Sequence, residues 1–193
     1  MADFNVAYNI TMGHEGGYAN HPSDTGGETW KGISRNNWPK WAGWPLVDRT
    51  KNEKPAKSLH ALNLSLSGNP ELNRYVLNFY KRHFWDVYSL DMVKSQAIAN
   101  EMFDSAVNMG IEVESKFLQR ALNLSNRNSN LYADLLVDGD IGPKTISVLN
   151  AHPRPQLVVK ILNVLQGARY ISICENRSSQ EVFVETWFSR VAL

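Results

Sequence analysis

The sequence predicts a mainly helical α+β fold, and three observations lead to this prediction. Apolar residues recur at intervals of three and four along most of the chain, as on the buried face of an amphipathic helix. Glycines and strand-forming residues concentrate between positions 16 and 34, where we expect one small β-hairpin. At 193 residues, 43% of them hydrophobic, the chain is long enough to bury one core, so we expect a single domain over 1–193.

The N-terminal secondary-structure elements are predicted from the spacing of apolar residues and from the glycines and prolines that interrupt it. Phe4, Tyr8 and Met12 are four apart, and the glycines that follow stop the period, so a first helix is expected to end near Glu15. A loop and the hairpin come next. The segment 36–67 has three prolines and no clear period, and its charge-rich stretch 49–57 is expected to be a solvated loop.

Helical periodicity resumes in the second part of the chain. Asn69 is a good helix cap and Pro70 a good first-turn residue, so a helix is expected to begin there and to continue to His83. Gly110 is expected to stop the following helix. The further helices are expected over 98–109, 113–122, 143–149 and 155–168, with a last short segment over 181–191.

Composition excludes several classes of protein. The formal net charge of +1 gives no reason to expect a nucleic-acid binder. Cys174 is the one cysteine, so no intramolecular disulfide is possible, and its place on an apolar helix favours a buried thiol over a nucleophile. The start of the chain lacks the pattern of a signal peptide, and no apolar run approaches the roughly 20 residues of a membrane span. We therefore expect synthesis in the cytoplasm and no membrane insertion.

Two carboxylates near the first glycine cluster are the main catalytic candidates. Glu15 stands at the predicted helix end beside two glycines and Tyr18, which would allow substrate to approach closely and would raise the pKa of the carboxyl by desolvation. A carboxylic acid of this kind can protonate a glycosidic oxygen. Asp24 has polar neighbours that would keep it ionised, but it can equally cap a turn. Glu28, on the hairpin, is a weaker candidate for the second carboxylate.

Further candidates concern substrate binding. Tyr18 and Trp30, with the other tryptophans that follow within 15 residues at 38, 41 and 44, could pack on sugar rings or could form core. Asp104 and Asn108 are four apart and so share a helix face, where they could bind N-acetyl or hydroxyl groups or could equally fix the hairpin to the helix. The histidines and carboxylates near Glu15 do not form a metal-binding HExxH motif, so neither a metal nor a cofactor is expected.

Five motifs occur in order along the chain: His14-Glu15-Gly16-Gly17-Tyr18, the run from Gly26 to Ser34, Tyr80 with Trp85, the run from Phe103 to Gly110, and the run from Asp138 to Thr145. Together they resemble the glycoside hydrolase family 108 N-acetylmuramidases, which include phage endolysins and secretion activator proteins. The resemblance implies a lysozyme-like helical fold with Glu15 as the catalytic residue, and a catalytic part over 1 to about 111. It also implies a predicted peptidoglycan-binding region over about 112–193, which we expect to pack on that part.

The order of Glu15, Asp24 and Thr29 is also similar to the Glu, Asp, Thr arrangement of phage-type lysozymes, whose threonine lies one residue farther on. Thr29 is therefore the candidate for positioning water. The resemblance implies cleavage of the β-1,4 bond between N-acetylmuramic acid and N-acetylglucosamine in peptidoglycan.

The expected protein is a monomeric muramidase that reaches the cell wall through a separate holin-like or export partner. It would serve in phage lysis or as a chromosomal enzyme. Two alternatives remain open: a non-catalytic peptidoglycan-binding or secretion-assisting protein, and a lytic transglycosylase.

Overall fold

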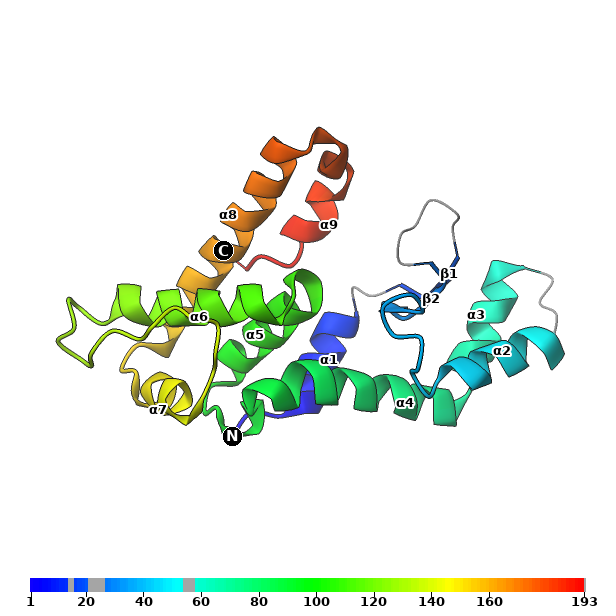
Figure 1. The fold of residues 1–193 in the computed structure, drawn as a ribbon, viewed down its shortest axis with the longest axis horizontal. Coiled ribbons are helices and arrows are strands. Elements are labelled where there is room, and N and C mark those ends of the chain that lie inside the picture. The colour runs from blue at the N-terminus through cyan, green and yellow to red at the C-terminus, as the bar shows by residue number, and fades with distance from the viewer. Residues whose placement is uncertain (14–15, 21–26, 54–57, 193) are drawn as a thin grey trace. The chain divides into compact units, whose positions relative to one another are not determined.

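The computed structural model of the chain describes residues 1–13, 16–20, 27–53 and 58–192 (Figure 1). Within these residues, nine α-helices and a small antiparallel sheet of three strands confirm the predicted mainly helical α+β, lysozyme-like fold. The helices are α1 Phe4–Met12, α2 Trp44–Glu53, α3 Leu59–Ser67, α4 Pro70–Tyr80, α5 Gln96–Met109, α6 Ile111–Ser125, α7 Pro143–Ala151, α8 Pro155–Asn176 and α9 Val184–Phe188. The strands are β1 Tyr18–Ala19, β2 Thr29–Trp30 and β3 Ile33–Ser34.

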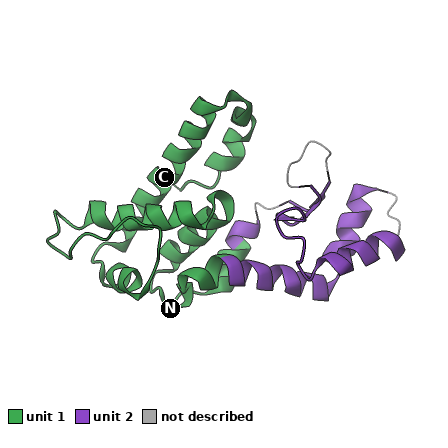
Figure 2. Cartoon of the chain, viewed as in Figure 1, with its two compact units in different colours: residues 1–9, 84–193 green, residues 10–83 purple. Residues whose placement is uncertain are grey.

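The chain forms two compact units, coloured separately in Figure 2. We call residues 10–83 the sheet unit, because they contain the three strands and helices α2 to α4. We call residues 1–9 together with 84–193 the bundle unit, because helices α5, α6 and α8 pack on one another there. Each unit has its own buried core and is described by itself.

The strands of the sheet unit are ordered β1-β2-β3, with both neighbouring pairs antiparallel. The predicted hairpin corresponds to β2 and β3, and β1 adds a third strand to it. Lys31 and Gly32 connect β2 to β3 with φ values of 44° and 78°. Two residues with positive φ are the requirement of a type I′ turn, which suits a tight hairpin. The core of this unit contains the fully buried side chains of Trp30, Ile33, Val47, Leu66, Leu72 and Val76.

The prediction of an irregular segment over 36–67 is wrong, because α2 and α3 lie within it. Pro45 occupies the first turn of α2, where the missing N–H would have no helical partner in any case. The charged residues of α2 belong to an amphipathic helix whose buried face carries Trp44 and Val47. Ser58 caps α3, since its side chain accepts a hydrogen bond from the N–H of Ala61.

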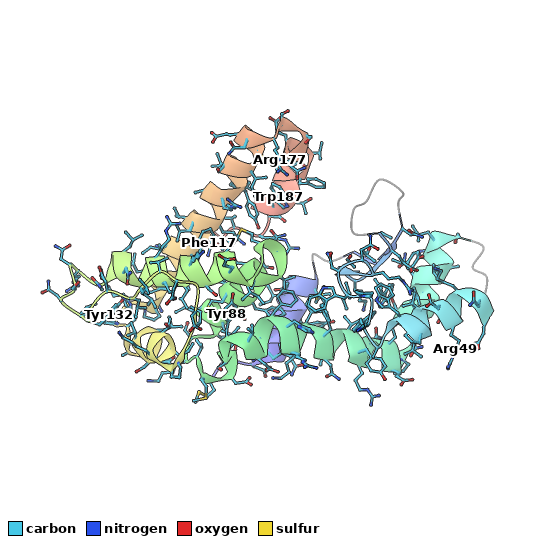
Figure 3. All side chains as sticks on the ribbon, viewed as in Figure 1. Arg49, Tyr88, Phe117, Tyr132, Arg177 and Trp187 are labelled. Atoms are coloured by element: carbon cyan, nitrogen blue, oxygen red, sulfur yellow. The ribbon has the colours of Figure 1, made fainter. Side chains whose placement is uncertain are left out.

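The bundle unit is built on three packed helices, and Gly110 ends α5 as predicted, with a φ of 92°. Helix α8 is 22 residues long and extends beyond its predicted end at 168. The 3-10 segment Ser178–Phe183 and α9, which carries Trp187 (labelled in Figure 3), pack on α8. The ring of Trp187 stacks on that of Tyr170 at a centroid distance of 5.1 Å. Consequently the C-terminal residues belong to the bundle.

Among the described residues, α8 is the one helix whose length and mean hydropathy of 1.3 would allow it to cross a membrane. Core helices of folded domains pass the same test. Helix α8 packs on α5 and α6, and its fully buried residues include the polar Asn163 and Gln166. These contacts are those of a core helix.

Candidate active site

The two carboxylates predicted to act in catalysis, Glu15 and Asp24, lie outside the described residues. Tyr18, Thr29 and Trp30 are described, and they come together in the sheet unit, where Tyr18 pairs with Trp30 across β1 and β2. The site is therefore built from the strands and helices that hold the chain on either side of the two carboxylates.

Asn63 of α3 holds the start of β1 in place. Its side-chain oxygen accepts a hydrogen bond from the N–H of Tyr18 at 2.7 Å. A Cβ atom at Gly17 would lie 2.3 Å from the same oxygen, so only glycine leaves room for this contact. The glycine directly before Tyr18 is thus explained by the close approach of a helix side chain.

Thr29 and Trp30 occupy different environments although they are adjacent on β2. The Thr29 side chain is half-buried, and its hydroxyl lies 3.5 Å from the carbonyl oxygen of Ala19, which is long for a hydrogen bond. Trp30 has no exposed surface. In this structure Trp30 is a core residue, and its contact with substrate stays a prediction, as does the role of Thr29 in positioning water.

Five charged or polar side chains meet beside the hairpin, and we call them the Glu28 cluster: Tyr18, Glu28, Arg35, Asp48 and Lys51. One oxygen of Glu28 accepts hydrogen bonds from the hydroxyl of Tyr18 at 2.8 Å and from the ammonium of Lys51 at 2.7 Å. Its other oxygen lies 2.5 Å from Nε of Arg35. Arg35 also donates two hydrogen bonds to Asp48, at 2.6 and 3.2 Å. The cluster therefore joins the sheet to α2.

The Glu28 cluster keeps Glu28 ionised. Burial acts to raise the pKa of Glu28, but the hydrogen bonds from Lys51 and Tyr18 and the charges of Lys51 and Arg35 outweigh it, so the pKa is lowered. An ionised carboxylate cannot donate a proton, and both oxygens of Glu28 are already occupied. These contacts favour a structural role for Glu28 over that of the second catalytic carboxylate.

Asp104 and Asn108 lie on one face of α5 in the bundle unit, and both contact C-terminal residues. Asp104 forms an ion pair with Arg190 at 2.7 Å, and the side chain of Arg190 is 3% exposed. Asn108 accepts a hydrogen bond from the hydroxyl of Tyr170 at 2.8 Å. Among the described residues these partners belong to the bundle unit and not to the hairpin, and the binding of substrate by Asp104 and Asn108 stays a prediction.

Two buried carboxyls in the bundle unit were not expected from the sequence. Glu101 of α5 is 9% exposed and accepts a hydrogen bond from Ser105 at 3.3 Å. Burial, with the nearby charge of Asp104, raises its pKa to about 7. Glu114 of α6 is fully buried, and burial raises its pKa well above the ordinary value. The sequence did contain a sign that Glu114 is buried, since it is four residues before Leu118 and so lies on the apolar face of its helix.

The four clustered tryptophans divide into two pairs. Trp30 and Trp44 are buried in the core of the sheet unit. Trp38 and Trp41 instead line a cavity of about 470 Å³ against α4 and the π-helical segment Lys81–Trp85 that follows it. The pair at this cavity is the one that remains accessible to a ligand.

No cluster of three or more His, Cys, Asp or Glu side chains that could hold a metal ion occurs in the part of the chain that the structure describes. Cys174 is a free, partly buried thiol on α8.

Comparisons with known proteins identify the family of the chain and a solved structure with a similar fold. The sequence model of the family described as glycosyl hydrolase 108 matches residues 8–110, and a model described as a predicted peptidoglycan domain matches residues 113–192. The solved structure of Brucella abortus SagA has a similar fold, with a TM-score of 0.55 and 21% identity over 97% of this chain and 88% of that chain. No curated protein sequence matches the chain.

The two matched regions meet near residue 111, whereas the two compact units are divided differently. Helix α5 lies within the first matched region, yet it packs on α6 and α8 of the second. The bundle unit thus contains helices from both matched regions.

Proposed function

Because the chain belongs to the glycosyl hydrolase 108 family, we propose that it is an N-acetylmuramidase that cleaves the β-1,4 bond between N-acetylmuramic acid and N-acetylglucosamine. The observation that carries the proposal is the family match over residues 8–110, a range that contains Glu15 and its glycines. The predicted peptidoglycan domain that follows supports peptidoglycan as the substrate.

In the proposed reaction Glu15 is the general acid. It protonates the glycosidic oxygen as the bond to the anomeric carbon breaks, and water completes the hydrolysis. Asp24 is the proposed second carboxylate, which stabilises the developing positive charge or activates the water, and Thr29 is the proposed residue that positions it. Glu28 is not assigned a chemical step, because Lys51, Tyr18 and Arg35 occupy its oxygens.

The described part of the sheet unit supports this proposal because it anchors a residue a few positions after each of the two carboxylates. Asn63 holds Tyr18, three residues after Glu15. The Glu28 cluster holds the residue four positions after Asp24. A catalytic acid needs such anchoring, because misplacement by about 1 Å lowers rates strongly.

We further propose that the enzyme works on the cell wall after release from the cytoplasm by a separate factor. A bacteriolytic role in phage infection and a role as a chromosomal enzyme both fit this route.

The experiment that tests the proposal is Glu15→Gln, assayed by the loss of turbidity of a peptidoglycan suspension. We expect lysis to disappear while sedimentation with peptidoglycan persists, because the amide keeps the shape of the side chain but cannot donate the proton. Glu71→Gln is the matched control, since Glu71 is an exposed carboxylate on α4. If Glu15→Gln clears the walls as well as the parent does, the assignment of the general acid is overturned.

Mass spectrometry of the released muropeptides separates hydrolysis from transglycosylation. A hydrolase adds water across the bond, whereas a lytic transglycosylase leaves a 1,6-anhydro sugar that is lighter by one water. We expect the hydrated product. If lysis requires Glu15 but the products are anhydro sugars, the protein is a transglycosylase.

A further inference from the structure

The cavity beside α4 is the feature of the sheet unit that no step above uses. It has a volume of about 470 Å³ and lies between residues 37–42 on one side and, on the other, α4 with the π-helical segment that follows it, which contribute Phe79 and His83. All of its lining residues belong to the sheet unit. The cavity is therefore defined within one compact unit.

One wall of the cavity is aromatic and firmly packed. The ring of Trp38 contacts those of Phe79 and His83 at centroid distances of 4.8 and 4.5 Å, and Trp41 packs on Trp44 at 5.2 Å. Trp38 nevertheless keeps 37% of its surface exposed. A rigid, partly exposed indole offers a flat apolar face to a ligand at little cost in conformational entropy.

The rim of the cavity is positively charged. Lys40 and Arg82 are exposed and line it, and among the described residues neither forms an ion pair with a carboxylate. None of the described lining residues is acidic. Burial and the charge of Arg82 lower the pKa of His83, so its ring is neutral near neutral pH. The charge of the cavity thus comes from Lys40 and Arg82.

The local backbone also distinguishes this place. Arg82 and His83 lie on the π-helical segment that continues α4, and single π turns inside helices occur frequently at functional sites. The amide side chains of Asn37 and Asn78 add hydrogen-bonding groups to the lining. An aromatic wall, two unpaired cations and two amides together fit an anionic ligand that has an apolar part.

We propose that this cavity binds the stem peptide of peptidoglycan, with Lys40 and Arg82 contacting its carboxylates and Trp38 packing on its apolar part. The proposal rests on peptidoglycan being the substrate, as argued above. In intact peptidoglycan both sugars are neutral, because the lactyl carboxyl of N-acetylmuramic acid is amide-bonded to the stem, whereas the stem peptide carries several free carboxylates. Charge complementarity therefore selects the peptide, and the cavity would act as a second contact with the stems of the substrate.

The direct test is binding of the free stem tripeptide L-Ala-γ-D-Glu-meso-diaminopimelate to the full chain, since the peptide has no bond for the enzyme to cleave. Isothermal titration calorimetry gives the affinity, and the indole N–H signals in a proton-nitrogen NMR spectrum report the site. We expect saturable binding that shifts the Trp38 signal. Arg82→Gln and Lys40→Gln should each weaken binding by about tenfold or more, and so should amidation of the peptide carboxylates.

Arg74→Gln is the matched control, because Arg74 is an exposed arginine of the same helix that does not line the cavity. It should leave the affinity unchanged. All three variants change exposed side chains and should melt at the temperature of the parent. The proposal is overturned if the tripeptide fails to bind, if the Trp38 signal does not move, or if Arg82→Gln binds as tightly as Arg74→Gln.

Failure of this inference is distinguishable from failure of the proposed function. Glu15→Gln should abolish lysis and retain tripeptide binding. Arg82→Gln should lose tripeptide binding and still cleave glycan strands from which an amidase has removed the stems. If a neutral chitooligosaccharide shifts the Trp38 signal while the tripeptide does not, the cavity is a saccharide site and the stem-peptide proposal is wrong.

Discussion

Carboxylates in the two units are stabilised in opposite ways. In the sheet unit, Glu28 is surrounded by Lys51, Arg35 and the hydroxyl of Tyr18, and its pKa is lowered. In the bundle unit, Glu101 and Glu114 are buried between helices, and their pKa values are raised. The same side chain is thus held as an anion in one unit and favours the neutral acid in the other.

This difference teaches that the environment, and not the residue type, decides what a carboxyl group can do. A proton donor needs the kind of environment that Glu101 has, yet Glu101 lies in a helix interface with Ser105 as its neighbour. A raised pKa on its own therefore does not identify the catalytic acid of this protein. The proposal for Glu15 rests on the family match and its motif instead.

The largest expected effect concerns the buried ion pair of the bundle unit, between Asp104 and Arg190. Arg190→Met removes the partner of Asp104, whose ion pair is almost fully buried. Breaking a buried pair in this way should lower the free energy of unfolding by about 3 to 5 kcal/mol, as measured by urea denaturation. The double variant with Asp104→Asn should recover much of the loss. A loss below about 1 kcal/mol in the single variant would contradict the structural importance of the pair.

The second prediction concerns Glu101 and pH. Its pKa is about 7 in the folded protein against an ordinary value of 4.5. Between these values the unfolded chain releases the proton and the folded protein keeps it, so stability falls as pH rises. Across this pH range the free energy of unfolding falls by about 3 kcal/mol in total. Glu101→Gln carries no such proton, and at about pH 8 it should unfold with a correspondingly higher free energy than the parent, but not at about pH 4.

Urea denaturation at the two pH values measures this difference. Glu175→Gln is the control, because Glu175 is an exposed carboxylate of the same bundle unit. A Glu101→Gln variant whose advantage is the same at both pH values would show that Glu101 does not keep its proton in the folded protein.

The helices of the bundle were predictable because each shows a regular apolar period with a clear stop. Helix α5 ends at Gly110 as the sequence indicates. Helices α2 and α3 were not predicted, because Pro45 and the charged residues were interpreted as signs of a loop. Pro45 is harmless in a first turn, and charge is expected on the solvent side of an amphipathic helix. The prediction failed because it did not consider where in a helix the proline and the charged residues would lie.

That error also hid the partners of Glu28. Lys51, 23 residues away along the chain, is supplied by α2, and only a helix beginning at Trp44 brings it to the hairpin. Asp48 of the same helix binds Arg35, the other cation that contacts Glu28. The same holds for the cavity, since Lys40 and Arg82 come from distant segments. By contrast, Glu15, Asp24 and Thr29 could be proposed from the sequence because they lie close together along the chain, and their roles stay predictions.

The third prediction tests the ionised carboxylate of the sheet unit. Glu28→Gln removes a charge that Lys51 and Arg35 both contact, and hydrogen bonds to charged groups contribute about 2 kcal/mol each in net terms. We expect the variant to lose about 2 kcal/mol of stability near neutral pH. Because the pKa of Glu28 is lowered, this contribution exists above the ordinary pKa and disappears as pH falls through the folded value.

The parent and Glu28→Gln should therefore approach equal stability in acid. At higher pH the Glu28→Gln variant should be less stable than the parent, whereas Glu101→Gln should be more stable. Thermal unfolding across acidic and neutral pH measures both trends on one scale. A stability difference that persists unchanged in acid would mean that the Glu28 contribution is not electrostatic.

The smallest expected effect concerns the backbone that leads into the Glu28 cluster. Gly27 has a φ of 67°, and a Cβ atom there would also lie 2.9 Å from the side chain of Asn36. Gly27→Ala should cost about 1 to 2 kcal/mol, because a residue with a side chain is strained in this conformation. Gly16→Ala is the matched control, since nothing lies within 4 Å of a Cβ atom at that position. Equal melting temperatures for the two variants would show that the left-handed conformation of Gly27 is not needed to hold Glu28 against Lys51 and Arg35.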